Sequence, residues 1–117
     1  MASPILNQIG AVFIPVSGIE KARDWYCEIL GIPADGEILF GHLYVLPMQE
    51  MNLVLDSKIY SEDRTFKTAA FHFNTEDIEE AYRYMEQKNV TLVTGIEHGQ
   101  WFNFQDPDGN LLMVCKC

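Results

Sequence analysis

The chain has 117 residues, which suits one compact domain and is too short for two independent ones. Its formal net charge of −9 disfavours a nucleic-acid partner, since such partners need clustered lysine and arginine. The same charge would attract a cationic small molecule, although acidic helix faces that keep the protein soluble would account for it equally well. Apolar runs are far shorter than a membrane span and no signal segment precedes them, so we expect no membrane partner and a cytoplasmic location.

The first half of the chain is predicted to form a strand, a helix and three short strands. Ser17 and Glu20 have the spacing of a capping box at the start of the helix, and Gly31 would end it. A polar stretch then predicts a linker to the second half. The predicted elements are strand 9–16, helix 19–30, strands 37–40, 41–46 and 51–56, and linker 57–67.

The second half is predicted to repeat this order of elements. Its last two strands flank Asp106-Pro107-Asp108-Gly109, where Pro107 presets φ for a tight turn and Gly109 supplies a positive φ. Asp106 can bond back to the backbone of this turn, so the stretch predicts a β-hairpin. The predicted elements are strand 68–74, helix 77–88, which Asn89 can close, and strands 91–94, 100–105 and 110–115.

An offset of 59 residues relates the two halves. Ile19-Glu20-Lys21-Ala22 recurs as Ile78-Glu79-Glu80-Ala81, and the order of elements continues at this offset without a gap. An internal duplication is the economical interpretation, with module one over about 9–56 and module two over about 68–115 of a single domain. Chance similarity between two amphipathic segments is the alternative.

Side chains alternate across a strand, so each strand divides into two faces. One face is apolar in both halves and is expected to lie under the helices. The other face mixes aromatic with polar groups, as a small-molecule cavity does. The alternative is that this face is a partner interface or a core closed by another chain. The cavity and the interface are compatible if the cavity lies at a dimer contact. The apolar face comprises Val12, Ile14, Leu43, Val45, Leu53, Leu55, Phe71, Phe73, Phe102, Phe104, Leu112 and Val114, and the mixed face Ala11, Phe13, His42, Tyr44, Asn52, Val54, Asp56, Ala70, His72, Trp101, Asn103, Leu111, Met113 and Cys115.

The three cysteines fit no metal-binding or disulfide framework. Cys115 and Cys117 are two residues apart, and a strand would hold them too far apart to bridge easily. Cys27 lies in a predicted helix. We therefore expect all three to be packing or surface thiols.

Two strand–helix–three-strand units resemble the vicinal oxygen chelate superfamily, which includes the glyoxalases, bleomycin resistance proteins, fosfomycin-modifying enzymes and extradiol dioxygenases. The motifs that carry the resemblance are P-V-S-G-I-E-K-A at the first helix and F-x-D-P-D-G-N before the last strand. It implies an α+β fold in which two tandem βαβββ modules form curved mixed sheets with helices on the outer face. It also implies a homodimer, but not one reaction, because this scaffold hosts many.

The resemblance places the metal ligands of metal-dependent members at Ala11, Val54, Ala70 and Met113. Alanine and valine have no donor atom, and a thioether is a poor ligand for a hard divalent ion, so neither a metal site nor a cofactor is expected. A displaced site of His72, His42 and Asp56 is an alternative, although a hydrogen-bonding or packing role for His72 is favoured.

The function predicted from these observations is binding of a small organic molecule, aromatic and cationic in character. No catalytic residue is assigned, because no nucleophile with a histidine partner is recognisable. A metal-dependent lyase, isomerase or dioxygenase with a displaced site is one alternative, and a protein-interaction module is another. The predicted ligand-binding residues are Phe13, His42, Tyr44, Asp56, His72, Trp101, Asn103 and Met113.

Overall fold

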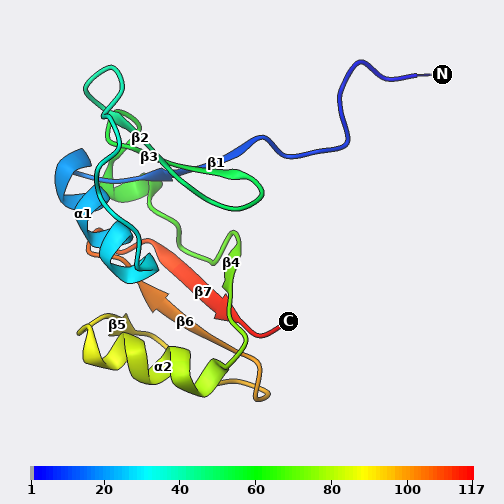
Figure 1. Cartoon of the computed structure of the whole chain (residues 1–117), viewed down its shortest axis with the longest axis vertical. Coiled ribbons are helices and arrows are strands. Elements are labelled where there is room, and N and C mark those ends of the chain that lie inside the picture. Colours follow the sequence, from blue (N-terminus) through cyan, green and yellow to red (C-terminus); the bar gives the residue numbers. More distant parts are fainter. Residues whose placement is uncertain (1) are drawn as a thin grey trace.

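The structure, a computed structural model, describes residues 2–117. Both helices lie on one side of the two small sheets, and the N-terminal segment leads away from the opposite side (Figure 1). No helix of this part of the chain is long and apolar enough to cross a membrane. The elements are β1 (Ala11–Pro15), α1 (Ile19–Leu30), β2 (Leu43–Leu46), β3 (Asn52–Asp56), the 3-10 helix η1 (Glu62–Arg64), β4 (His72–Asn74), α2 (Ile78–Gln87), β5 (Thr91–Leu92), β6 (Trp101–Gln105) and β7 (Leu111–Cys115).

Both sheets are mixed. The first has the strand order β1-β3-β2 and the second the order β4-β7-β6-β5. In each, the strand before the helix pairs in parallel with the last strand of its module, while the remaining pairs are antiparallel. The predicted α+β class and the predicted β6–β7 hairpin are therefore confirmed.

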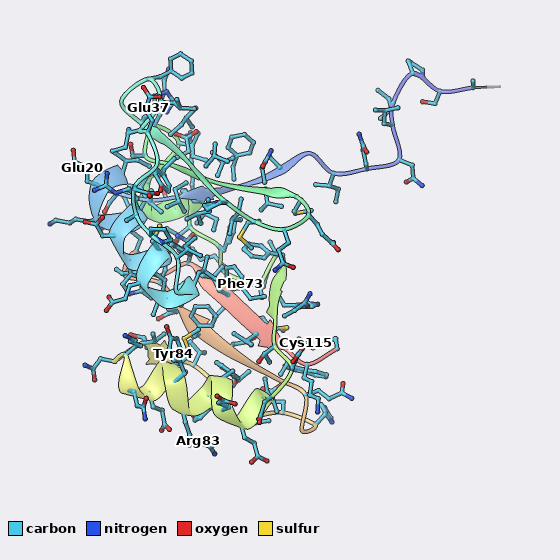
Figure 2. The ribbon with its side chains drawn as sticks, viewed as in Figure 1. Glu20, Glu37, Phe73, Arg83, Tyr84 and Cys115 are labelled. Atoms are coloured by element: carbon cyan, nitrogen blue, oxygen red, sulfur yellow. A yellow bond between two sulfur atoms is a disulfide. The ribbon has the colours of Figure 1, made fainter. Side chains whose placement is uncertain are left out.

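The helices cover the apolar face of the sheets. α1 packs on β2 and β3, and α2 packs on β7. The Tyr84 hydroxyl of α2 donates to the carbonyl oxygens of Glu28 and Ile29 of α1, at 3.1 and 3.2 Å, so it ties the two helices together (Figure 2). The fully buried side chains beneath the helices include Ile14, Leu46, Leu55, Phe102, Phe104 and Leu112.

The two helices begin differently and end alike. The predicted capping box is wrong, because Gly18 is the N-cap of α1 with no side-chain bond, and the Ser17 amide donates to Asp108 at 2.9 Å instead. In α2, the Asp77 side chain accepts from the Glu80 amide. Both helices are followed by a left-handed residue, Gly31 at φ 68° and Asn89 at φ 58°, as predicted.

The gapless offset of 59 residues is wrong for β2. The turns that precede β2 and β6 carry Phe40-Gly41 and His98-Gly99, all at positive φ, and they are 58 residues apart. Tyr44 thus corresponds to Phe102 and not to Asn103. A one-residue slip moves every side chain of a strand to the other face, and Tyr44 and Leu46 are accordingly buried, whereas Val45 is 40% exposed.

One predicted strand does not form, and another is shorter than expected. The stretch 37–40 is not a strand, because the turn at Phe40 and Gly41 brings the chain straight back and leaves only a bridge between Leu39 and Leu43. The stretch 91–94 pairs only at Thr91 and Leu92. The first sheet therefore has three strands and the second has four.

The expectation that the cysteines are unpaired is wrong for two of them. Cys115 and Cys117 form a disulfide, and Cys27 is a buried free thiol. β7 ends at Cys115, and the Lys116 amide then donates to the Gln100 carbonyl oxygen. The chain is no longer extended there, so the two α-carbons approach to 5.4 Å, within the range that a disulfide spans.

A buried carboxylate joins the two modules. Asp106, 4% exposed, accepts from the backbone amides of Asp108 and Asn110 and, at 2.6 Å, from the Tyr26 hydroxyl of α1. The Asn110 amide group donates both to Asp106 and to the Pro15 carbonyl oxygen, each at 2.8 Å. The predicted bond from Asp106 to its own turn is confirmed, and the turn also holds the end of β1 and the middle of α1.

We expect Tyr26→Phe to lower the free energy of unfolding by about 1.5–3 kcal/mol, because it removes a hydrogen bond to a buried carboxylate. Burial and the adjacent Asp106 raise the pKa of Tyr26 well above its usual 10. This contribution should therefore be complete below pH 10 and be lost at higher pH. Urea unfolding at several pH values measures both effects. Tyr82→Phe, in a half-buried tyrosine outside this network, is the control, and equal losses in the two variants would contradict the prediction.

Candidate ligand-binding face

The face of the sheets that no described helix covers is called the open face here. Residues paired across neighbouring strands point to the same side of a sheet, so the pairing defines its composition. Phe13, Val54 and Val45 form one row across the first sheet. His72, Met113 and Asn103 form the equivalent row across the second.

The central row of the second sheet carries three of the predicted ligand-binding residues side by side. Asn103 and Met113 are half-buried, and His72 at the sheet edge is exposed. The side-chain oxygen of Asn103 is buried and has no hydrogen-bond partner within residues 2–117. A buried unpaired acceptor costs free energy, and a donor group that reached this oxygen would recover that cost.

Trp101 lies on the same face, one row further along, opposite Cys115. Its indole N–H donates to Glu97 at 3.0 Å, and its ring centroid is 5.1 Å from that of His98. The ring is half-buried, whereas the neighbouring Phe102 and Phe104 are fully buried. The two predicted faces of β6 are therefore confirmed.

His42 and Asp56 contact each other at the end of the first sheet. His42 Nδ1 lies 2.9 Å from an Asp56 oxygen, and the same oxygen accepts from the Lys58 amide. Asp56 is 6% exposed, and both of these bonds go to one of its two oxygens. Within residues 2–117, these two residues do not form a metal-holding group with His72, which lies near Cys115 and Cys117 instead.

Tyr44 is not on the open face. It is 1% exposed on the helix side, where its hydroxyl accepts from the Gly36 amide at 3.1 Å. Its predicted orientation is wrong because the one-residue slip described above reverses β2. Val45 takes its place on the open face, and the two positive-φ turns at Gly41 and Gly99 are the signal from which the correct offset could have been read.

Two clefts lie elsewhere, and both are small. One of about 170 Å³ lies between the start of α1 and the Asp106 turn, and one of about 140 Å³ lies between α2 and β4. Enclosed sites for drug-sized ligands are about 300–1,000 Å³. Neither cleft includes a residue of the two open-face rows.

Two modules that each place one helix on one side of a small mixed sheet define a glyoxalase-like domain. The chain belongs to the glyoxalase/bleomycin resistance protein/dioxygenase superfamily, whose family model matches residues 8–114. The family expected from the sequence motifs is thereby confirmed. A comparison with curated proteins found no match.

Solved structures similar to this chain span several functions. A superfamily member from Sphaerobacter thermophilus DSM 20745 is 25% identical, with a TM-score of 0.72 and coverage of 94% of this chain and 97% of that one. TnmS3, an antibiotic binding protein from Streptomyces sp. CB03234, is 22% identical, with a TM-score of 0.73 and coverage of 94% and 95%. A lactoylglutathione lyase from Agrobacterium tumefaciens is 17% identical, with a TM-score of 0.70 and coverage of 97% and 95%. At these identities, the similarity to the last two proteins concerns the fold alone.

The residues at the four positions where the family resemblance places metal ligands do not fit a divalent ion. Ala11 and Val54 lie on the first sheet, Ala70 precedes β4, and Met113 is in β7. Three of these side chains are hydrocarbon, and the fourth is a thioether, which hard ions bind poorly. These four side chains therefore support no reaction step that uses a metal ion at these positions.

We expect Trp101→Ala to lower the free energy of unfolding by about 1 kcal/mol, because the ring is half-buried and outside the core beneath the helices. Phe102→Ala, one residue along the same strand, should cost about 3–5 kcal/mol as a buried aromatic. Urea unfolding of both variants beside the parent measures the difference. A core-sized loss for Trp101→Ala would show that Trp101 belongs to the core.

Proposed function

We propose that this chain binds a small organic molecule on the open face and that the metal positions of the family hold no ion. One observation carries the proposal. The four family positions lack hard donors, while the row of His72, Met113 and Asn103 presents a thioether, an imidazole and a buried unpaired carbonyl oxygen.

The chemistry of the face favours a flat, aromatic ligand that carries a donor group and a positive charge. Trp101 and Phe13 offer π faces, which attract cations, and Met113 packs well against aromatic rings. Asn103 Oδ1 would accept the donor, and the net charge of −9 would attract a cation over a long range. His42 and Asp56 would orient polar groups at the far end of the face.

The antibiotic-binding neighbour supports this proposal, since it shows that this fold serves a binding protein. The lyase neighbour shows that the fold also serves an enzyme, so a metal-dependent reaction at a displaced site is the second candidate. It is less supported, because Asp56 already binds His42 and accepts a hydrogen bond from the Lys58 amide of the turn. The cytoplasmic location expected from the sequence stays a prediction.

A second chain is proposed to close the open face. Phe13 is 49% exposed and Val45 is 40% exposed in the first sheet, and Ile5, Leu6 and Ile9 ahead of β1 are 67–79% exposed. Exposed apolar side chains in this number mark a candidate interaction site. A homodimer would bury this surface and would convert an open sheet into an enclosed cavity.

We expect light scattering at micromolar concentration to give twice the mass of one chain. Phe13→Asp should give the mass of a single chain, because it introduces a charge into the apolar surface. Phe40→Asp is the matched control: Phe40 is 85% exposed at a turn and should leave the dimer intact. A parent chain that is monomeric at this concentration would rule out the proposed closure.

Ligand binding can be tested with a panel of tricyclic aromatic cations and their neutral analogues. In a Trp25→Phe background Trp101 is the only tryptophan, so its fluorescence reports on the open face. We expect Asn103→Leu to weaken binding about tenfold, or about 1.4 kcal/mol, by removing the acceptor. The same change should leave the free energy of unfolding unchanged or raise it, because a buried unpaired oxygen is lost.

Gln105→Leu is the control for this test, since it makes the same change two residues along the strand on the same face. It should leave the dissociation constant unchanged. The proposal fails if no member of the panel changes the fluorescence of Trp101 or the melting temperature. It also fails if Asn103→Leu and Gln105→Leu bind equally well.

A further inference from the structure

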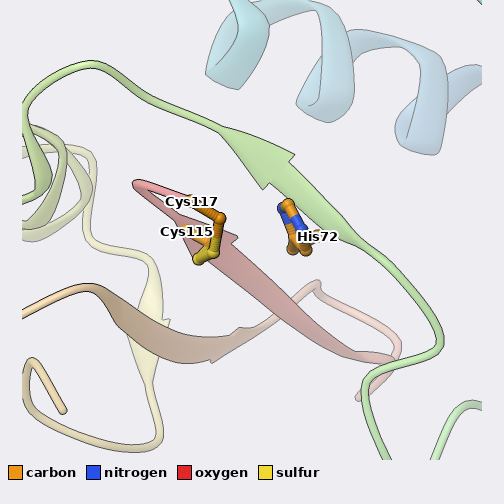
Figure 3. A group of neighbouring side chains, drawn as sticks. All are labelled: His72, Cys115 and Cys117. Atoms are coloured by element: carbon orange, nitrogen blue, oxygen red, sulfur yellow. A yellow bond between two sulfur atoms is a disulfide. The ribbon is translucent and has the colours of Figure 1, made fainter. Parts of the chain in front are cut away.

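Three potential metal ligands meet at the end of the second sheet. His72 of β4 lies beside Cys115 and Cys117, and one side-chain ligand atom from each residue lies within 4.8 Å of the others (Figure 3). None of the three occupies a family metal position. His72 and Cys117 are exposed, whereas Cys115 is 1% exposed.

The fold brings these residues together through parallel strand pairing. β4 pairs with β7 so that His72 lies opposite Met113 and Asn74 lies opposite Cys115. Cys115 points to the open face, in the same row as Trp101. The Lys116 amide then donates to the Gln100 carbonyl oxygen at 2.7 Å, which continues the β6–β7 pairing, so alternation places Cys117 on the same face as Cys115.

We propose that the reduced Cys115–Cys117 pair and His72 form a Zn²⁺ site, and that the disulfide is its metal-free form. Thiolate and imidazole are the ligands that zinc prefers. Two cysteines and one histidine supply three ligands and leave a fourth position for water or an exogenous group. This site shares His72 with the proposed ligand-binding row, but it does not depend on the binding of an organic molecule.

His72 also has a contact that orients its ring. Its Nδ1 lies 3.4 Å from the carbonyl oxygen of Phe73. In the tautomer with the proton on Nδ1, this nitrogen faces the carbonyl and the Nε2 lone pair is free for the metal. Metal-bound histidines typically use their second nitrogen in this way.

The two forms are linked by thiol–disulfide exchange with an external dithiol. Two electrons and two protons pass from the dithiol to the disulfide, which gives two cysteine thiols and the oxidised dithiol. Zn²⁺ then replaces the two thiol protons and takes the His72 lone pair, releasing two protons. An external disulfide reverses the sequence: it takes the two electrons, the Cys115–Cys117 bond forms, and Zn²⁺ leaves. In a reducing compartment the dithiol form is favoured.

The test compares the full chain with its disulfide intact and after reduction by a phosphine that is then removed without oxygen. Zn²⁺ is titrated against a chromophoric chelator, and Co²⁺ serves as a spectroscopic probe. The reduced parent should bind one Zn²⁺ per chain, raise its melting temperature with zinc, and give a thiolate-to-cobalt charge-transfer band. The oxidised parent should bind less than one tenth of that amount, and chelator should leave its melting temperature unchanged.

Cys117→Ser and His72→Ala each remove one ligand from an exposed position, so both variants should fold. Each should weaken zinc binding at least 100-fold, and Cys117→Ser should also reduce the charge-transfer band. The controls are Cys27→Ser, at the buried thiol of α1, and His98→Ala, at the exposed turn before β6, which should bind zinc like the parent.

The inference is overturned if the reduced parent binds no zinc, or if either ligand variant binds as tightly as the parent. The first result would leave the proposed organic ligand untouched, because that binding is assayed through Trp101 and Asn103 without zinc. One tightly held Zn²⁺ per chain in the oxidised parent, or in Cys117→Ser, would place the metal elsewhere. That result would overturn this inference.

Discussion

The carboxylate of Asp106 is the group on which the arrangement of the two modules depends. It is almost fully buried, and a buried charge is tolerated only when hydrogen bonds replace its water. Its oxygens receive donors from its own turn, from the Tyr26 hydroxyl and from the Asn110 side chain. Asn110 in turn holds the end of β1 through Pro15 and the linker through the amide of Phe66. A turn of module two is thereby fastened to α1 and β1 of module one and to the linker.

This fastening determines which face of each sheet remains open. Tyr26 belongs to α1, so the network holds that helix in place over the first sheet, and the Tyr84 contact holds α2 beside it. With both helices on one side, neither helix covers the rows of Phe13 and of His72. The open face is therefore a consequence of the core, and its side chains are free to differ without loss of the fold. Alanine, valine and methionine at the four positions where the family resemblance places metal ligands are compatible with the fold for this reason.

The two modules are similar without being superimposable in sequence. Module two is one residue shorter between the start of its helix and the positive-φ turn, and one residue longer between that turn and its last strand. The two changes cancel, which is why a single offset fits the first and last strands of both modules and fails between them. Tyr44 and Phe102 are equivalent core residues, and Val45 and Asn103 are equivalent residues of the open face.

The sequence by itself determined the α+β class, both helices with their C-terminal caps, the β6–β7 hairpin and the faces of most strands. These features depend on local spacing, on glycine and proline, and on the alternation of apolar residues, all of which are visible along the chain. Only the tertiary structure decided the face of β2, the loss of the strand at 37–40, the pairing of His42 with Asp56, and the meeting of His72 with Cys115 and Cys117. Each of these depends on a single-residue change of register or on a contact between distant segments. Local patterns cannot reveal either, because alternation is equally regular in both registers and says nothing of which strand lies alongside.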